Sequence, residues 1–183
     1  MKKAIALLII WFSCTNVSFA SEINEQFDKG VRLLNGRRFQ EAAAAFQKVT
    51  DKDRNNAEAW FYAGQSWFGA GRCQDSLNAY EEAIHVQPAK GNYWIGKGTS
   101  LLCLGRTDDS LRAFEKALKL DKNLDYAWYG LARCYALKAE KETALKHLVR
   151  AIELKSQYKD MAYRDRSFRN LSNDKDFQKL IEP

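Results

Sequence analysis

Apolar residues in the segment "AWFYAGQSWFGAG", residues 59–71, follow the spacing of one face of an α-helix. This face carries four residues separated by three or four positions: Trp60, Ala63, Gly64 and Trp67. The following segment carries a row of polar side chains: Gln74, Asp75, Asn78, Glu81 and Glu82. The pattern predicts a helix over about residues 58–70, a turn at Gly71 and a second helix, with a wet outer face, over about residues 74–85.

The same pattern returns every 34 residues along the chain. Its aligned positions are Trp60, Trp94 and Trp128; Gly64, Gly98 and Ala132; Trp67, Leu101 and Tyr135; Ala42, Ser76, Ser110 and Ala144; Phe46, Tyr80, Phe114 and Leu148; and Val49, Ala83, Ala117 and Ala151. A fixed period of this length is typical of an array in which one pair of helices stacks on the next. Gly64 and Gly98 fall inside helices, where glycine is unfavourable, so we expect an aromatic ring to approach the backbone closely at both positions.

These residues resemble the tetratricopeptide repeat family, whose pattern is Trp, then Leu-Gly, Tyr, an Ala-aromatic-Ala group and a closing Pro. The resemblance covers residues 21–158 as four copies, at 23–56, 57–90, 91–124 and 125–158. Copy two is the fullest match and keeps its closing Pro88. It implies an all-α, right-handed superhelical solenoid of helix-turn-helix repeats.

Copy one is degenerate, and three departures from the family pattern make the ends of the later copies less sharp without threatening the fold. Gln26 stands in copy one where the other copies have tryptophan. Lys122 and Ser156 replace the closing proline, and Ala139 replaces the turn glycine of copies two and three.

Residues 159–183 follow the last copy and carry apolar residues among charges: Phe168, Leu171, Phe177, Leu180 and Ile181. Ser172 to Asp174 offer side chains that can cap a last short helix. A solenoid needs its exposed end covered, so we predict a C-terminal helical cap on copy four.

The resemblance also implies a second face on the first helix of each copy, which lines the concave groove of the superhelix. The groove positions are Phe27, Val31 and Leu34 in copy one; Phe61, Gln65 and Phe68 in copy two; Ile95, Thr99 and Leu102 in copy three; and Tyr126, Tyr129 and Arg133 in copy four. A largely apolar groove of this length predicts a partner-binding site for a protein or peptide. The alternative is that superhelical curvature or the C-terminal segment buries these residues inside the molecule.

A carboxylate clamp, by which some members of the family hold a C-terminal carboxylate, is absent. The clamp uses lysine, asparagine and arginine at groove positions. Here those positions carry Phe27, Val31, Tyr62, Asn92 and Gly96.

The first twenty residues have the order of a secretory signal peptide. Lys2 and Lys3 precede an apolar run that is too short to span a bilayer, and the stretch ends in Ser-Phe-Ala at residues 18–20. We predict cleavage after Ala20 and a periplasmic or secreted protein. An alternative is a lipoprotein anchored through Cys14, although the three residues before Cys14 depart from the usual Leu-small-small pattern.

Composition and charge add little to this picture. The chain is 46% hydrophobic and 28% charged, as folded proteins are, and its formal net charge of +6 falls to +4 when Lys2 and Lys3 are removed. A mild excess of this kind fits a scattered surface charge, and we expect no nucleic-acid partner. The sequence shows no phosphate loop, metal-ligand spacing or nucleophile motif. We therefore predict no enzyme activity, catalytic residue, metal, cofactor or small-molecule substrate.

The mature chain would keep three cysteines, an odd number for an oxidising compartment. Cys134 takes a small, buried helical position and is predicted to be an inert thiol. Cys73 and Cys103 lie near the same end of adjacent copies. The sequence is therefore compatible with two alternatives: a disulfide between them, or two reduced thiols.

From these observations we predict an exported protein-protein interaction module that binds an apolar peptide or a partner helix in the concave groove. The alternative is a structural subunit or a self-associating scaffold of a cell-envelope assembly, such as secretion, pilus or cell-wall machinery.

Overall fold

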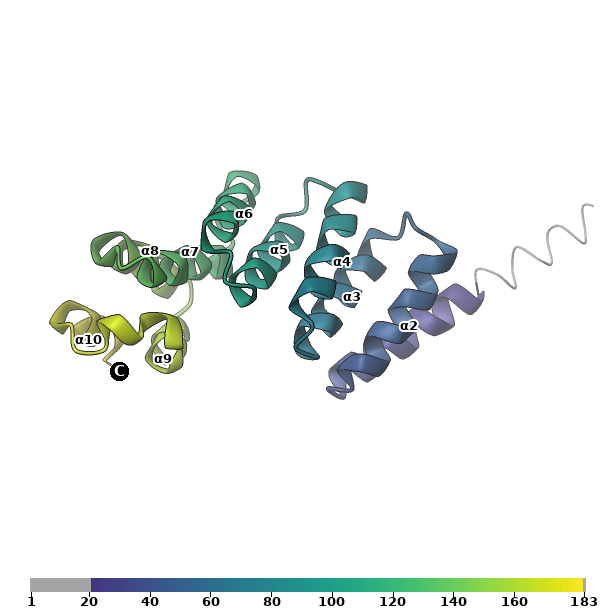
Figure 1. Ribbon diagram of the computed structural model, residues 1–183, viewed down its shortest axis with the longest axis horizontal. Coiled ribbons are helices and arrows are strands. Elements are labelled where there is room, and N and C mark those ends of the chain that lie inside the picture. The colour runs from purple at the N-terminus through teal and green to yellow at the C-terminus, as the bar shows by residue number, and fades with distance from the viewer. Residues whose placement is uncertain (1–20, 183) are drawn as a thin grey trace, which may run out of the picture.

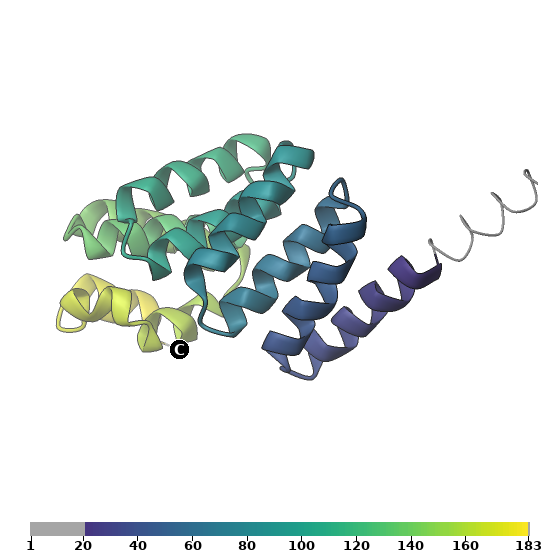
Figure 2. The same ribbon diagram turned by 45° about the vertical axis from the view of Figure 1, so that its right-hand side comes forward.

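The computed structural model describes residues 21–182, which form helices joined by short turns (Figure 1). The first helix covers residues 21–35. It is followed by α2 (Phe39–Lys52), α3 (Ala57–Gly69), α4 (Cys73–Val86), α5 (Gly91–Cys103), α6 (Thr107–Leu120), α7 (Asp125–Leu137), α8 (Lys141–Leu154), α9 (Tyr158–Arg164), the 3-10 helix η1 (Arg166–Leu171) and α10 (Lys175–Ile181). Figures 1 and 2 show the helices stacked in chain order from the N-terminal to the C-terminal end.

Consecutive helices pair with each other, which confirms the predicted all-α stack of helix-turn-helix units. In copy two, α3 and α4 each begin one residue before the predicted start. The described residues contain no β-strand.

A residue in the left-handed backbone region ends the tight turn between the two helices of each copy. Gly71 and Gly105 have φ angles of 75° and 74°, and Arg37 and Ala139 occupy the corresponding positions with φ angles of 57° and 60°. Glycine adopts this conformation without strain, whereas a residue with a Cβ pays roughly 1–2 kcal/mol. The turn therefore forms without glycine in copies one and four, but the backbone of Arg37 and Ala139 is strained there.

Two large rings of the second helices, Tyr80 and Phe114, each pack between two glycines. A Cβ atom at Gly64 would lie 3.0 Å from the Tyr80 ring, and one at Gly98 would lie 2.9 Å from the Phe114 ring, which confirms the expected close approach. On the other side of Tyr80, a Cβ at Gly96 would overlap the ring. The missing side chains are thus what allows neighbouring copies to stack closely.

The repeated tryptophans of copies two to four each form a hydrogen bond with the loop that precedes their copy. The indole Nε1 of Trp60 donates to the Arg54 carbonyl and that of Trp94 donates to the Pro88 carbonyl, both at 2.9 Å. Trp128 donates in the same way to the Lys122 carbonyl at 2.8 Å. Because only a backbone carbonyl is needed, a lysine in place of the closing proline preserves this contact.

The C-terminal segment, defined here as residues 158–182, lies against copy four (Figure 2). Its first part continues the 34-residue register, since Ser167 contacts Arg133 and Asn170 contacts Ala136. The helix breaks at Asp165, whose extended backbone separates α9 from η1. The segment therefore occupies the place of a fifth copy's first helix in a broken form.

Three buried aromatic side chains attach the C-terminal segment to copy four. Tyr158, Phe168 and Phe177 are at most 3% exposed and pack in one cluster with residues of α7 and α8. The Asp174 side chain caps α10 by accepting from the Phe177 amide at 3.0 Å, as the sequence suggested. These contacts cover the apolar end of the stack.

Cys73 and Cys103 form a disulfide that joins the start of α4 to the end of α5, with Cα atoms 6.1 Å apart. The bond ties copy two to copy three. Cys134 is a fully buried free thiol, and burial raises its pKa to about 11, so the thiolate form is strongly disfavoured.

Candidate partner-binding groove

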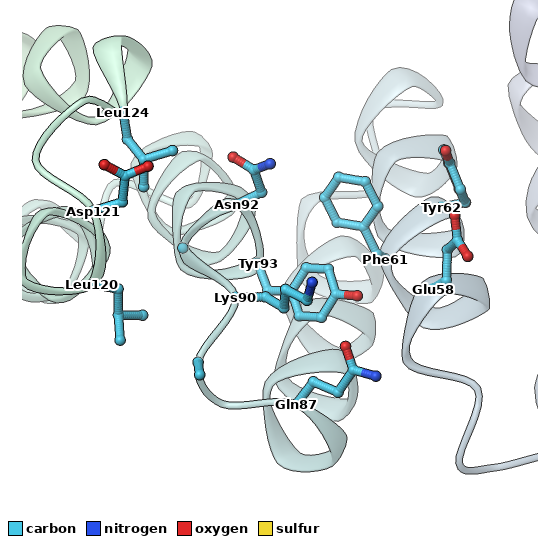
Figure 3. Close-up of a pocket in the computed structure, with 12 residues that line it drawn as sticks. Glu58, Phe61, Tyr62, Gln87, Lys90, Asn92, Tyr93, Leu120, Asp121 and Leu124 are labelled. Atoms are coloured by element: carbon cyan, nitrogen blue, oxygen red, sulfur yellow. The ribbon is translucent and has the colours of Figure 1, made fainter.

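Two adjoining hollows run along the inner face of copies two and three, with volumes of about 380 and 530 Å³. The first is lined by Phe61, Gln65, Phe68, Tyr80, Asn92, Ile95, Gly96, Thr99, Leu124, Asp125 and Tyr126. The second shares Phe61, Asn92 and Leu124 with it and continues toward the α4–α5 and α6–α7 loops. Together they form what is called the open groove below. Figure 3 shows the second hollow, with Phe61 from α3 and Tyr93 from α5 directed into the space between their helices.

Phe61 is held in place by surrounding rings. Its centroid lies 5.2 Å from that of Tyr93, 5.4 Å from Tyr62 and 5.9 Å from Tyr80. These contacts leave Phe61 half-buried, with the rest of its surface in the open groove. Phe68 lies about two helical turns further along α3 and is 39% exposed. The pair therefore combines one rigid ring with one freely accessible ring.

The polar side chains of the open groove differ in whether they form hydrogen bonds within the protein. Thr99 donates its hydroxyl to the Ile95 carbonyl at 2.9 Å, a bond within its own helix. Gln65 forms no side-chain hydrogen bond with another described residue, so its amide is available to a ligand. At the loop end, Figure 3 shows Glu58 and Asp121 on opposite sides of the hollow with Lys90 between them.

Six of the twelve predicted groove residues line one hollow in the structure: Phe61, Gln65, Phe68, Ile95, Thr99 and Tyr126. The copy-one positions Phe27, Val31 and Leu34 instead pack against the core around Phe46. Leu102 similarly packs against the core around Phe114. These four are half-buried and lie outside both hollows.

Tyr129 and Arg133 lie beneath the C-terminal segment, contrary to the expectation that they face a partner. Tyr129 is 1% exposed, and its hydroxyl donates to Asp165 at 3.0 Å. The Arg133 guanidinium pairs with the same carboxylate at 2.8 Å. The broken helix brings Asp165 and Phe168 onto α7, so the chain itself fills this part of the groove.

The groove's copy-four border is also fixed electrostatically. Burial acts to raise the pKa of Asp125, but the ammonium of Lys155 and the hydroxyl of Tyr158 outweigh it, so the pKa lies below its ordinary value. Burial, followed by the charge of Asp165, raises the pKa of Tyr129. Both groups keep their ordinary charge states near neutral pH, and they hold the border in place.

Tyr93 and Leu124 line the open groove but were not predicted from the sequence. Tyr93 stands where copies two and four have Ala59 and Ala127, so its departure from the aligned position was a usable signal. Leu124 lies at the start of α7, where only the superhelical stacking brings it to the hollow. Tyr80 was assigned to packing and does pack, but its ring also forms part of the groove.

His147 is half-buried on α8. Its ring stacks on Tyr135 at 5.3 Å and on Trp128 at 5.6 Å. Burial lowers its pKa below the ordinary value. This environment holds the imidazole as a neutral packing group.

The described residues 21–182 contain neither a metal-binding cluster nor a membrane-spanning helix. Nowhere in that range do three or more His, Cys, Asp or Glu side chains gather as a metal ion would need. None of the helices in that range is long and apolar enough to cross a bilayer. The predicted signal peptide, its cleavage after Ala20 and the alternative anchor Cys14 lie outside the described residues.

Comparisons with known proteins agree with this architecture. A tetratricopeptide repeat family model matches residues 27–92 and 95–159, more than half of the chain. A crystal structure of MamA protein aligns with a TM-score of 0.73 at 18% identity, covering 88% of this chain and 91% of that chain. YrrB, described as a TPR protein with an unusual peptide-binding site, aligns with a TM-score of 0.65 at 19% identity and covers 88% of each chain.

A third solved structure is the first TPR of Spaghetti (RPAP3) bound to the HSP90 peptide SRMEEVD. It aligns with a TM-score of 0.57 at 15% identity, covering 70% of this chain and 94% of that chain. At these identities the likeness shows the fold alone. No curated protein matches the chain.

Proposed function

The chain belongs to the tetratricopeptide repeat family, and from this premise we propose that it is an exported interaction module that binds an apolar protein segment in the open groove. Proteins of this family and fold are typically non-catalytic interaction modules. YrrB and the RPAP3 domain are both described as binding peptides, which supports the same class of activity for this chain.

The observation that carries the proposal is the accessible apolar surface of copies two and three. Phe68 is 39% exposed and lies beside Phe61 and Ile95 along one groove. An apolar groove is a common docking site for an extended segment or an amphipathic helix, because burying its rings removes apolar surface from water.

The chemistry of the lining defines the occupant. The rings and aliphatic side chains require apolar anchors from the partner, and the free amide of Gln65 offers one hydrogen bond to its backbone. The charges of the loop end, Glu58, Lys90 and Asp121, lie at the rim, where they contribute little affinity. The proposed occupant is therefore a mainly apolar segment of a protein partner.

The test is binding of a labelled peptide that alternates leucine or phenylalanine with serine, measured by fluorescence anisotropy. We expect Phe61→Ala combined with Phe68→Ala to weaken binding by about tenfold or more, since two apolar anchors are lost. The matched control is Leu137→Ala combined with Val149→Ala, which removes two exposed apolar side chains outside the groove.

Unchanged binding by a folded Phe61→Ala, Phe68→Ala variant would exclude the groove. The scaffold alternative makes a different prediction for light scattering of the chain alone. If the chain forms concentration-dependent oligomers that the same double substitution dissolves, the groove serves self-association and the adaptor proposal is wrong.

Export is the second part of the proposal. The disulfide between Cys73 and Cys103 supports it, because structural disulfides persist mainly outside the reducing cytosol. Mass spectrometry of the protein from its native envelope should show a mature chain that begins at Ser21. Thiol titration under denaturing, non-reducing conditions should then find Cys134 alone. An intact N-terminus or an acylated Cys14 would contradict cleavage after Ala20.

A further inference from the structure

The C-terminal segment carries a basic hollow that the open groove does not include. The hollow has a volume of about 280 Å³ and lies where α9 turns into η1. Arg164, Arg166 and Arg169 all line it and are exposed. Tyr163 lines it as well and is 76% exposed, more than any other exposed large apolar side chain in the described residues.

The positive charge of this hollow is not neutralised within the described chain. Asp165 is its one acidic lining residue, and that carboxylate is already engaged by Arg133 at 2.8 Å and by Tyr129 at 3.0 Å. None of the three lining arginines forms an ion pair with a residue in the range 21–182. The break in the helix at Asp165 therefore turns the carboxylate inward and leaves the guanidinium groups outside.

Five arginines elsewhere each pair with a carboxylate three residues away in the chain: Arg38, Arg72, Arg106, Arg112 and Arg150. Arg32, Arg37 and Arg54 also lack an ion pair within residues 21–182, but none of them lines a hollow described above. The three arginines around the hollow lie within six residues of each other, so their combined field attracts an anionic ligand.

We propose that this hollow is a second docking site, which binds an acidic segment of a protein partner. Guanidinium groups bind carboxylates through paired, planar hydrogen bonds, and three of them surround one hollow. The Tyr163 ring at the edge can cover an apolar side chain of the same segment. The site is separate from the open groove, because the two share no lining residue.

The shape of the site favours a protein segment over an anionic membrane. A concave hollow surrounds a side chain that projects into it, whereas a flat bilayer would contact only its outer edge. The base of the hollow is apolar, from the buried Ala162, Phe168 and Phe177, and the exposed Tyr163 ring at its edge suits an apolar residue between acidic ones.

The experiment uses the mature chain and a fluorescein-labelled peptide, Glu-Glu-Phe-Glu-Glu, with Gln-Gln-Phe-Gln-Gln as the neutral control. We expect the acidic peptide to bind more tightly and its affinity to fall with added salt. Arg166→Gln combined with Arg169→Gln should weaken binding by about tenfold, while circular dichroism stays unchanged, because both side chains are exposed.

Arg32→Gln combined with Arg54→Gln is the matched control, since it removes the same charge from exposed positions away from the hollow. Equal binding of both peptides, or equal loss in both double variants, would overturn the proposal. Sedimentation of the chain with vesicles of anionic phospholipid, without binding of the acidic peptide, would assign the hollow to a membrane surface instead. If the Arg166→Gln, Arg169→Gln variant fails to fold, two other measurements test the site: the affinity of the Tyr163→Ala variant for the acidic peptide, and the salt dependence of that affinity in the wild-type chain. An affinity that changes with neither the substitution nor the salt concentration would contradict the site.

Discussion

The inner face of copies two and three is open, whereas the corresponding face of copy four is closed by the chain itself. Phe61 and Tyr129 occupy the same aligned position, yet Phe61 borders a hollow and Tyr129 is 1% exposed. The neighbour of α3 is the unbroken helix α5, and the neighbour of α7 breaks at Asp165 and folds onto it as η1. Beside α3 the unbroken α5 leaves a groove, whereas the broken C-terminal segment fills the corresponding face of α7.

The comparison also shows how one aligned position can serve two roles. Gln65 and Thr99 border the open groove, and Arg133 at the same position holds Asp165 of the C-terminal segment. Arg133 therefore has an ionic partner within the chain, whereas Gln65 and Thr99 border an accessible face. Four predictions test this contrast.

The largest effect is expected where the closed face is held. Phe168 is 1% exposed and packs on Tyr129 and Phe177, with centroids 5.9 and 5.6 Å away. Phe168→Ala should lower the free energy of unfolding by about 3–5 kcal/mol in urea denaturation, because a large buried ring leaves a cavity. Tyr163→Ala, at a 76% exposed ring, should change it by less than about 0.5 kcal/mol. Similar values for the two variants would show that the segment does not hold copy four.

Gly96 tests the packing beneath the open groove. A methyl group there would overlap the Tyr80 ring, which also lines the groove. Gly96→Ala should cost about 1–3 kcal/mol of unfolding free energy in urea denaturation. Gly36→Ala is the control, since its new Cβ would meet nothing nearer than 3.4 Å. A fully stable Gly96→Ala variant would mean that Tyr80 moves freely in the groove floor.

Substitutions in the turns between paired helices should change the unfolding free energy by a smaller amount, with opposite signs in copies three and four. Ala139 in copy four has a φ of 60°, where copies two and three have Gly71 and Gly105. Ala139→Gly should raise the unfolding free energy by about 0.5–1 kcal/mol, since glycine removes the strain but adds freedom to the unfolded chain. Gly105→Ala should lower it by a similar amount, about 0.5–1 kcal/mol, because the strain it adds is partly offset by the reduced freedom of the unfolded chain. Thermal melts measure both, and equal signs would contradict the strain at Ala139.

The smallest effect concerns pH and the outer side of copy four. His147 stands where copies two and three have Ala79 and Ala113, and its ring is stacked between Trp128 and Tyr135. Burial and then Lys146 lower its pKa below 6.5, and Glu115 opposes them. As the pH falls below 6.5, the unfolded chain therefore takes up a proton before the folded chain does, and stability decreases.

His147→Gln removes this proton linkage. The loss of unfolding free energy between about pH 7.5 and about pH 5 should be smaller in the variant than in the wild-type chain. His85→Gln, at an exposed histidine, serves as the control. An unchanged pH dependence in His147→Gln would show that the ring takes up its proton equally in both states.

Much of the fold could be predicted because the contacts that define it join residues within one repeat or between adjacent repeats. Glycines recur where rings must approach, tryptophans recur where an indole reaches the preceding loop, and the helix bounds of α3 and α4 follow from them. The site could be predicted only in part. Phe61, Phe68 and Ile95 were found from their register, while Phe27 and Tyr129 share that register and lie elsewhere.

Sequence periodicity by itself determined the helices, their pairing and the residues that hold each pair together, because these contacts join residues of one copy or of adjacent copies. The tertiary structure decided which inner faces stay open. That outcome depends on how a neighbouring helix sits against each face, and a single break at Asp165 closes copy four while copies two and three remain accessible. The tertiary structure also decided which arginines form ion pairs. The break at Asp165 places its carboxylate against Arg133, and the guanidinium groups of the C-terminal segment remain unpaired within the described chain.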